Sequence, residues 1–243
     1  MNDDLRNIVL GVIATGVAAA LGWFARTYLW RRKLRRKQRF FGLPDDSECL
    51  LVVNRKAGGG DWSVARRDVF ALLELSALIK DCGAQTQIVA HDTAQQGIGD
   101  HTEFCIGGPI SNLRTAAHLD SLLPGVQMNT DPEPGPDRGS FLIGGERYRW
   151  QPDSVEHVLL ARLFGQGDGG RPVFLVSGQH SNANHAAARY LGRHHSRLAA
   201  KHGDKSFCLL LRVVNPQAYG PDVVELVADV TRTATAAPPV RTP

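Results

Sequence analysis

The sequence predicts a three-layer, Rossmann-like α/β domain with a mostly parallel sheet and an antiparallel edge, preceded by an N-terminal transmembrane helix. Two wholly apolar segments, residues 49–54 and 172–176, suit strands buried on both faces of a sheet. Strand-like and helix-like segments alternate along most of the chain, which favours parallel strands covered by helices. A long uncharged stretch near the N-terminus supplies the membrane helix.

The expected membrane anchor covers residues 1–30, with its helix over about residues 7–30. Residues 8–24 carry no charged side chain, and at a rise of about 1.5 Å per residue the helix can cross a bilayer. Aromatic residues cluster at its end, where the basic run at 31–39 follows directly. We therefore expect an integral, single-pass protein of the cell membrane, with its N-terminus outside and its C-terminal domain cytoplasmic.

Two alternatives to a transmembrane helix fit the sequence less well. A cleaved signal peptide needs its basic residues before the apolar run, and an in-plane helix needs a polar face, for which Thr15 alone is available. Ala14, Ala18 and Gly22 share one helix face, and this spacing permits a homodimer through the membrane helix. The same spacing also arises by chance in an alanine-rich segment, so both interpretations stay open.

The net charge of +4 belongs to one short segment. Residues 31–39 hold seven Lys and Arg side chains, and subtracting them leaves −3 for the rest of the chain. The charge therefore gives no evidence for a nucleic-acid-binding face on the folded body, and we expect no nucleic-acid partner. We interpret residues 31–48 as a basic juxtamembrane segment followed by a linker.

The elements of the body follow one another over residues 49–232. Helices are expected at about 61–81, 113–123, 154–164 and 182–201. Strands are expected at 49–54, 85–91, 102–106, 126–129, 141–143, 147–150, 172–176, 207–214 and 224–230. The last two strands form an antiparallel hairpin, residues 130–140 form an exposed loop, and residues 233–243 form a disordered tail.

Three strand-to-helix corners are expected at the carboxyl edge of the sheet, where α/β proteins bind ligands. Glycine allows close approach of the backbone, and a helix start offers N–H groups to an anion. The predicted ligand-binding residues are Gly60, Asp61, Gly107, Gly108, Asn112, Ser177, Gly178, His180 and Asn182. Tight turning alone also explains such glycines, so a purely structural role stays open.

No complete catalytic or cofactor signature is present. The glycines match neither G-x-x-x-x-G-K-[ST] nor G-x-G-x-x-G, and Ser177 lacks the preceding glycine of a nucleophile elbow. The histidines and cysteines show no metal-ligand spacing, so we predict no metal site, and the cofactor is unknown. Glu156 and His157 could supply an acid or base, while Asp153 fits a helix cap equally well.

Three functions remain open on this basis. The first is a membrane-anchored sensor or signalling module that binds a nucleotide-like or other anionic small molecule. The second is an enzyme that acts on a nucleotide or phosphorylated substrate in the same crevice, with unknown catalytic residues. The third is a structural anchor that binds only protein. The absence of a catalytic signature favours the first over the second.

Overall fold

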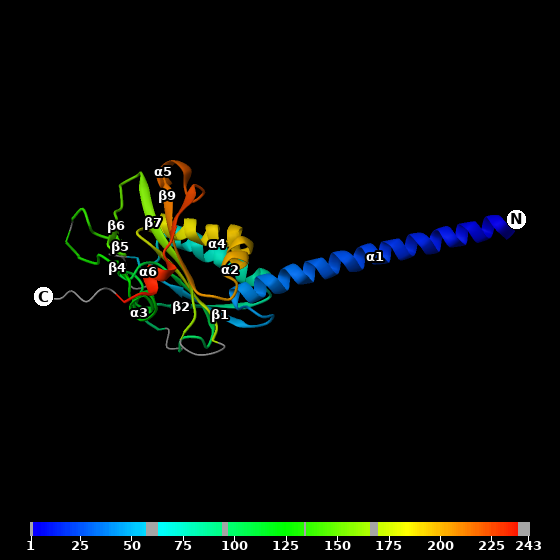
Figure 1. Ribbon diagram of the computed structural model, residues 1–243, viewed down its shortest axis with the longest axis horizontal. Coiled ribbons are helices and arrows are strands. Elements are labelled where there is room, and N and C mark those ends of the chain that lie inside the picture. The colour runs from blue at the N-terminus through cyan, green and yellow to red at the C-terminus, as the bar shows by residue number, and fades with distance from the viewer. Residues whose placement is uncertain (1, 57–62, 94–96, 134, 166–169, 238–243) are drawn as a thin grey trace.

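The computed structural model describes residues 2–56, 63–93, 97–133, 135–165 and 170–237. In the first helix it describes the side chains of Asn7, Leu10 and Ile13 and of all residues from Thr15 onward. An α/β body carries one long helix, α1 (Asn2–Phe41), which projects far beyond it and ends at the N-terminus (Figure 1).

A seven-stranded sheet forms the centre of the body, in the order β10-β9-β7-β8-β3-β1-β2. Five of its strands (β9, β8, β3, β1 and β2) point the same way, whereas β7 and β10 run antiparallel to them. Its strands are β1 (Glu48–Val53), β2 (Gln85–Ala90), β3 (Thr102–Ile106), β7 (Val155–Leu163), β8 (Val173–Gly178), β9 (Phe207–Val214) and β10 (Val224–Asp229).

Each face of the sheet buries its own hydrophobic core. Helices α2 (Arg66–Asp81) and α4 (Ser181–His202) cover one face. The other is covered by α3 (Leu113–Leu122) and by a small antiparallel sheet of β4 (Val126–Met128), β5 (Phe141–Ile143) and β6 (Glu146–Tyr148). The expected α/β class with a mostly parallel sheet is confirmed. Antiparallel pairing extends beyond the expected edge hairpin of β9 and β10, because β7 also runs antiparallel between β8 and β9.

The segment at residues 154–164 was expected to be a helix and is instead strand β7, so that prediction was wrong. β7 pairs with β8 on one side and β9 on the other, and eight of its nine residues are buried. A short apolar run satisfies the periodicity of a buried helix and of a buried strand equally well. Here the hydrogen-bonded pairing with β8 and β9 makes the segment a strand rather than a helix.

The expected linker also differs, because α1 continues through the basic run to Phe41. Lys and Arg are good helix formers, and Gly42 ends the helix with φ +63°. Phe40, Phe41 and Leu43 are buried in the core between the sheet and α4. The helix is therefore built into the body rather than tethered to it by a flexible segment.

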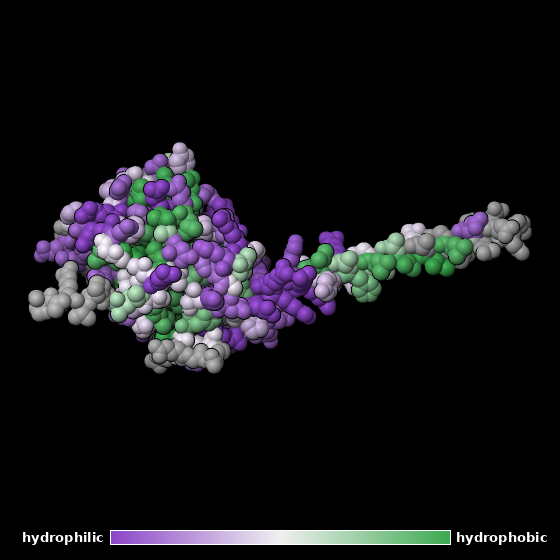
Figure 2. All heavy atoms as spheres, viewed as in Figure 1, coloured by the Kyte–Doolittle hydropathy of each residue, from purple (hydrophilic) through white to green (hydrophobic). Residues whose placement is uncertain are grey.

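The surface of α1 changes character along its length. The part next to the body is hydrophilic, and the part beyond it carries exposed hydrophobic side chains (Figure 2), among them Val17, Leu21, Trp23 and Phe24. Among the residues that the structure describes, no helix contains a stretch both long and apolar enough to cross a membrane.

The C-terminal segment is ordered further than expected. Residues Thr231–Thr235 form the short helix α6, which follows β10 directly. Val230 and Ala234 are buried with the core beneath α3. The remaining short helix, α5 (Pro216–Tyr219), connects β9 to β10.

Candidate functional site

The carboxyl ends of β1, β3 and β8 meet at one edge of the sheet, because these strands are parallel neighbours. The chain leaves β1 and β8 into helices on one face, and it leaves β3 into α3 on the other face. Adjacent strands whose connections depart to opposite faces open a crevice between them. Both neighbours of β3 meet this criterion, so the sheet has a topological switch point on each side of β3, one towards β1 and one towards β8.

The turns at residues 107–112 and 177–182 lie side by side at this edge, as the sequence predicted. The backbone N–H of Gly107 donates to the carbonyl of Val176 at 2.9 Å. A β-carbon on Gly108 would lie 3.4 Å from the carbonyl oxygen of Gly178. Gly60 and Asp61, which were expected to join them, lie outside the described residues.

Asn112 is fully buried and serves the backbone. Its Oδ1 accepts a hydrogen bond from the N–H of Thr115 at 3.0 Å, which caps α3, and its Nδ2 donates to the carbonyl of Ile106 at 2.9 Å. The side chain thus ties the start of α3 to the end of β3. This geometry supports the structural role of Asn112, because both ends of its amide are occupied.

Gly107 and Gly178 are required by close packing. Gly107 has φ +101°, and a β-carbon there would lie 2.7 Å from Cβ of Asn54. A β-carbon on Gly178 would lie 2.7 Å from Oδ1 of Asn184, to which its own N–H donates at 2.8 Å. Both glycines therefore keep the edge compact whether or not a ligand is bound.

The other predicted residues of the β8–α4 corner differ in exposure. Ser177 is fully buried, and its hydroxyl has no hydrogen-bond partner within the described part of the chain. His180 is exposed, and its ring lies against Trp150 with the two centroids 4.4 Å apart. Asn182 directs its amide towards Glu156 at 3.4 Å. These side chains come from one turn but do not converge on one another.

Sequence reasoning missed a buried polar network that links four elements at this edge. The carboxylate of Asp68, in the first turn of α2, accepts hydrogen bonds from Asn54 at 2.9 Å and from Asn184 at 2.8 Å. Burial raises the pKa of Asp68, and these two hydrogen bonds oppose the rise. Oδ1 of Asn54 is buried and has no partner among the described residues.

Glu156 belongs to the start of β7, and its side chain reaches the first turn of α4. It accepts the N–H of Ala183 at 3.1 Å, and the charge of Arg67 also acts on its carboxyl group. Burial raises the pKa of Glu156, and the hydrogen bonds at α4 lower it in part. The carboxyl groups of Asp68 and Glu156 therefore both reach the first turn of α4, from α2 and from β7.

The start of α2 is basic and lacks a side-chain cap. Arg66 and Arg67 occupy its first turn, whereas the N-cap residue, Ala65, offers no capping hydrogen bond. Positive side chains are unfavourable at the positive end of a helix, where acids are the usual residues. The start of α2 therefore combines two arginines and an uncapped N-terminus with one acidic residue, Asp68, in the same turn.

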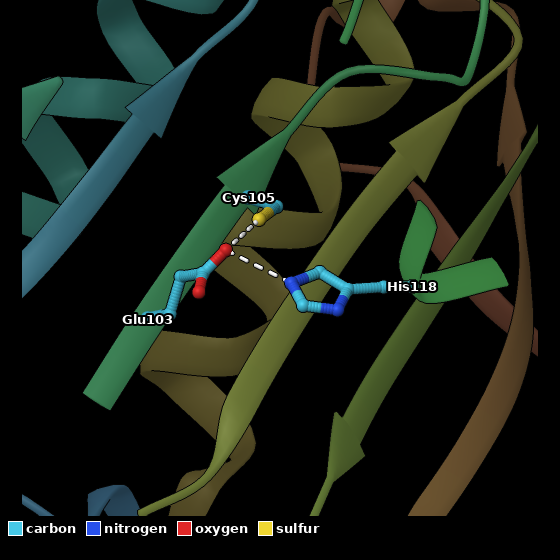
Figure 3. Close-up of side chains that lie close together, drawn as sticks. All are labelled: Glu103, Cys105 and His118. Carbon is cyan, nitrogen blue, oxygen red and sulfur yellow. Dashed lines mark hydrogen bonds and ion pairs between the residues drawn. The ribbon is translucent and has the colours of Figure 1, made fainter. Parts of the chain in front are cut away.

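A second buried cluster lies beneath α3, away from the edge. Glu103 and Cys105 come from β3 and His118 from α3, with the thiol and the imidazole directed at one carboxylate oxygen (Figure 3). Their ligand atoms lie within 4.8 Å of one another, so by residue type they could hold a metal ion. Arg114 also donates to both oxygens of Glu103, at 2.9 Å each.

The charges favour a structural ion network in this cluster over a metal site. Burial alone would raise the pKa of Glu103, but hydrogen bonds from His118 and Arg114 lower it to about 2. The guanidinium already neutralises the carboxylate and occupies the lone pairs that a cation would need. The cluster therefore fastens α3 to the sheet through an ion pair between a buried carboxylate and a partly buried guanidinium.

Comparisons with known proteins give no relative for this chain. No protein-family profile, no curated protein and no solved structure matches it. Its function must therefore be argued from its own residues.

Proposed function

We propose that the chain is a membrane-attached α/β module that binds a nucleotide-like, anionic small molecule at the carboxyl edge of its sheet and acts as a sensor or signalling module. The observation that carries the proposal is the basic, uncapped start of α2 next to the switch point between β1 and β3. A helix start of this kind is suited to a phosphate group, because its N–H groups and its dipole both favour an anion.

Arg66 and Arg67 favour a bound phosphate at the start of α2. Placing a cation in the first turn of a helix costs roughly 0.3–1 kcal/mol, because it opposes the macrodipole. A bound phosphate between Arg66 and Arg67 would offset that cost and gain charge-assisted hydrogen bonds. The charge of Arg67 acts on the carboxyl group of Glu156, which also accepts the N–H of Ala183 in the first turn of α4. This supports a crevice shared by the starts of α2 and α4.

Buried polar atoms at the same edge support a ligand that is polar as well as anionic. Oδ1 of Asn54 is an acceptor, and the hydroxyl of Ser177 both donates and accepts; each is buried without a partner among the described residues. Leaving such atoms unpaired costs about 1–3 kcal/mol each. A nucleotide has hydroxyl and amine groups that could pair with them.

Membrane attachment through α1 is the second part of the proposal. The exposed hydrophobic side chains of α1 stand outside the body, and lipid would cover them. The basic run follows the apolar part, so we expect the domain on the cytoplasmic side. A reporter enzyme fused to the C-terminus should be active only if it functions in the cytoplasm, and activity of an exported reporter would refute this orientation.

An enzyme acting in the same crevice is the second candidate. It is favoured by the arrival of two carboxyl groups, Asp68 and Glu156, at the first turn of α4. Both have pKa values raised by burial, as acid–base groups in active sites often have. Incubation of the full chain with a bound nucleotide, followed by chromatography of the products, separates an enzyme from a binding module.

The binding proposal is tested by isothermal titration of the full chain with nucleoside triphosphates and with the matching nucleosides. We expect triphosphate binding that weakens at least about tenfold in the Arg66→Ala/Arg67→Ala variant, because two charged hydrogen-bond donors are lost. The matched control is Lys80→Ala/Arg197→Ala, which removes the same charge from exposed positions far along α2 and α4. Equal binding in all three proteins would overturn the proposal, and so would the absence of binding.

A further inference from the structure

A groove lies between α1 and α4, at the opposite end of the body from the carboxyl edge. It encloses about 980 Å³ and is lined on the α4 side by His195, Ser196 and Ala199. On the α1 side it is lined by Trp30, Leu34 and a row of basic residues. A volume of this size is typical of a site for a small organic ligand.

Only some of the basic residues of α1 line the groove. Lys33, Arg36, Lys37 and Arg39 line the groove, whereas Arg31, Arg32 and Arg35 do not. Lys37 pairs with Asp81 at 3.2 Å. Lys33, Arg36 and Arg39 have no carboxylate within 4.0 Å among the described residues. Asp81 and Asp204 also line the groove, so its lining holds four basic side chains and two carboxylates and keeps an excess of positive charge.

The walls of the groove are held in place by buried contacts. Arg162, 1% exposed, donates to the carbonyl of Phe40 at 3.2 Å and to those of Gly203 and Lys205 at 2.6 Å each. Its guanidinium also lies 4.6 Å from the centroid of the Phe40 ring. The end of α1 and the end of α4 are thus fixed to the same buried cation, so the groove between them is preformed.

The position of the groove along α1 matches the boundary of a bilayer. It begins at Trp30, an exposed aromatic residue at the end of the hydrophobic part of the helix. At about 1.5 Å per residue, Lys33 and Arg36 lie roughly 4.5 Å and 9 Å further along the axis. The headgroup layer on each side of a bilayer is roughly 5–8 Å thick, so Lys33 falls within it and Arg36 at its outer boundary. Arg39, roughly 13.5 Å along the axis, lies beyond it and has to reach back with its long side chain.

We propose that this groove binds the phosphodiester headgroup of one anionic phospholipid, with Lys33, Arg36 and Arg39 around the phosphate and Trp30 at the start of the acyl chains. The inference rests on the membrane attachment proposed above. The excess positive charge of the groove favours an anionic headgroup over a neutral one. The hydrophobic part of α1 next to Trp30 favours a lipid, with its acyl chains, over a free anion. Such a lipid would fix the orientation of the body on the membrane surface.

Native mass spectrometry of the full chain in a non-ionic detergent tests the proposal. The protein is titrated with phosphatidylglycerol, with phosphatidylcholine and with inorganic phosphate. We expect one phosphatidylglycerol per chain, bound about tenfold or more tightly than phosphatidylcholine. Each basic residue near the headgroup adds to the binding free energy of an anionic lipid. We also expect that inorganic phosphate does not displace it. Equal binding of the two lipids, or displacement by phosphate, would overturn the proposal.

Two triple variants with the same change of charge separate the groove from general attraction to anions. Lys33→Ala/Arg36→Ala/Arg39→Ala should abolish the preference for phosphatidylglycerol, whereas Arg31→Ala/Arg32→Ala/Arg35→Ala should keep it within about twofold. Equal losses would show nonspecific attraction and refute the site. A change of the groove variant from dimer to monomer would instead identify a second copy of the chain as the occupant, which also refutes it.

Flotation with neutral phosphatidylcholine vesicles tests membrane attachment separately, because the preference for an anionic lipid plays no part there. Failure to float would refute attachment through α1. A wild-type chain that floats but shows no preference in the titration would refute the lipid site alone.

Discussion

The guanidinium of Arg162 donates a hydrogen bond to the carbonyl oxygen of Phe40, a residue 122 positions earlier in the chain. This bond joins the end of α1 to the end of strand β7. Arg162 is among the largest fully buried side chains of the body, and its other hydrogen bonds go to the segment after α4. The end of α1 is therefore fastened to the body by a buried hydrogen bond.

Arg162→Met should destabilise the body by about 3 kcal/mol, because one buried and two part-buried carbonyl groups lose a charged donor. Urea unfolding of the full chain in a non-ionic detergent, followed by tryptophan fluorescence and circular dichroism, measures the loss. The variant should also become sensitive to protease at residues 40–43, where α1 enters the core. Arg212→Met, an exposed substitution on β9, is the control. Unchanged stability of Arg162→Met would contradict the clamp.

The Glu103 network predicts a loss of stability in acid. The pKa of Glu103 is about 2 in the folded chain, below the ordinary value of 4.5. A carboxyl group with a lowered pKa stabilises the fold fully above its unfolded pKa, and that stabilisation is lost as the pH falls through the folded value. We expect a decrease of about 3 kcal/mol between pH 5 and pH 2 from this group, measured by urea unfolding across that range.

Glu103→Gln should flatten that part of the pH profile and lower stability at pH 7, because Arg114 would then be partly buried without its carboxylate. Glu48→Gln, which changes an exposed glutamate, should leave the profile unaltered. A wild-type profile retained by Glu103→Gln would show that other groups cause the acid sensitivity.

Asn112→Ala should lower stability and leave ligand affinity unchanged. The substitution removes the cap of α3 and a buried hydrogen bond to Ile106, at a combined cost of about 1–2 kcal/mol. Thermal melting measures the stability and isothermal titration calorimetry measures the ligand affinity, both on the same preparation. A loss of affinity with unchanged melting would show that Asn112 contacts the ligand, contrary to the cap geometry.

Two glycines on the α4 side of the sheet should respond in opposite directions to alanine. Gly178→Ala places a β-carbon 2.7 Å from Oδ1 of Asn184 and should destabilise the body by about 1–3 kcal/mol. Gly192→Ala, inside α4, meets its nearest atom at 4.0 Å and should stabilise by about 0.5–1 kcal/mol. Thermal melting of both variants checks the signs, and a stabilised Gly178→Ala would show that the α4 start is loosely packed.

The fold class and the pairing of the two turns followed from sequence patterns because both depend on local periodicity and on the parallel-strand rule. The helical end of α1 and strand β7 could not be predicted in the same way. Their conformations are decided by partners remote in sequence, as the bond between Arg162 and Phe40 illustrates. The apolar run at 154–164 fits a helix or a strand, and the basic run at 31–39 fits a helix or a linker, until those partners are known.

The candidate site was predictable only in outline. The glycines and small polar residues identified the corners, but the network around Asp68 joins residues 14 and 116 positions apart in the chain. Asn54 and Asn184 carry no sequence signal of burial. Asn112, in contrast, was expected to be either a cap or a ligand contact, and its geometry supports the cap.

Hydrogen exchange of the full chain with and without a nucleoside triphosphate tests the proposed ligand site most directly. We expect slower exchange in peptides covering residues 63–72 and 106–112, at the start of α2 and the end of β3, with no change at residues 195–204 beside the α1 groove. Protection confined to the groove, or protection absent from the carboxyl edge at saturating nucleotide, would contradict it.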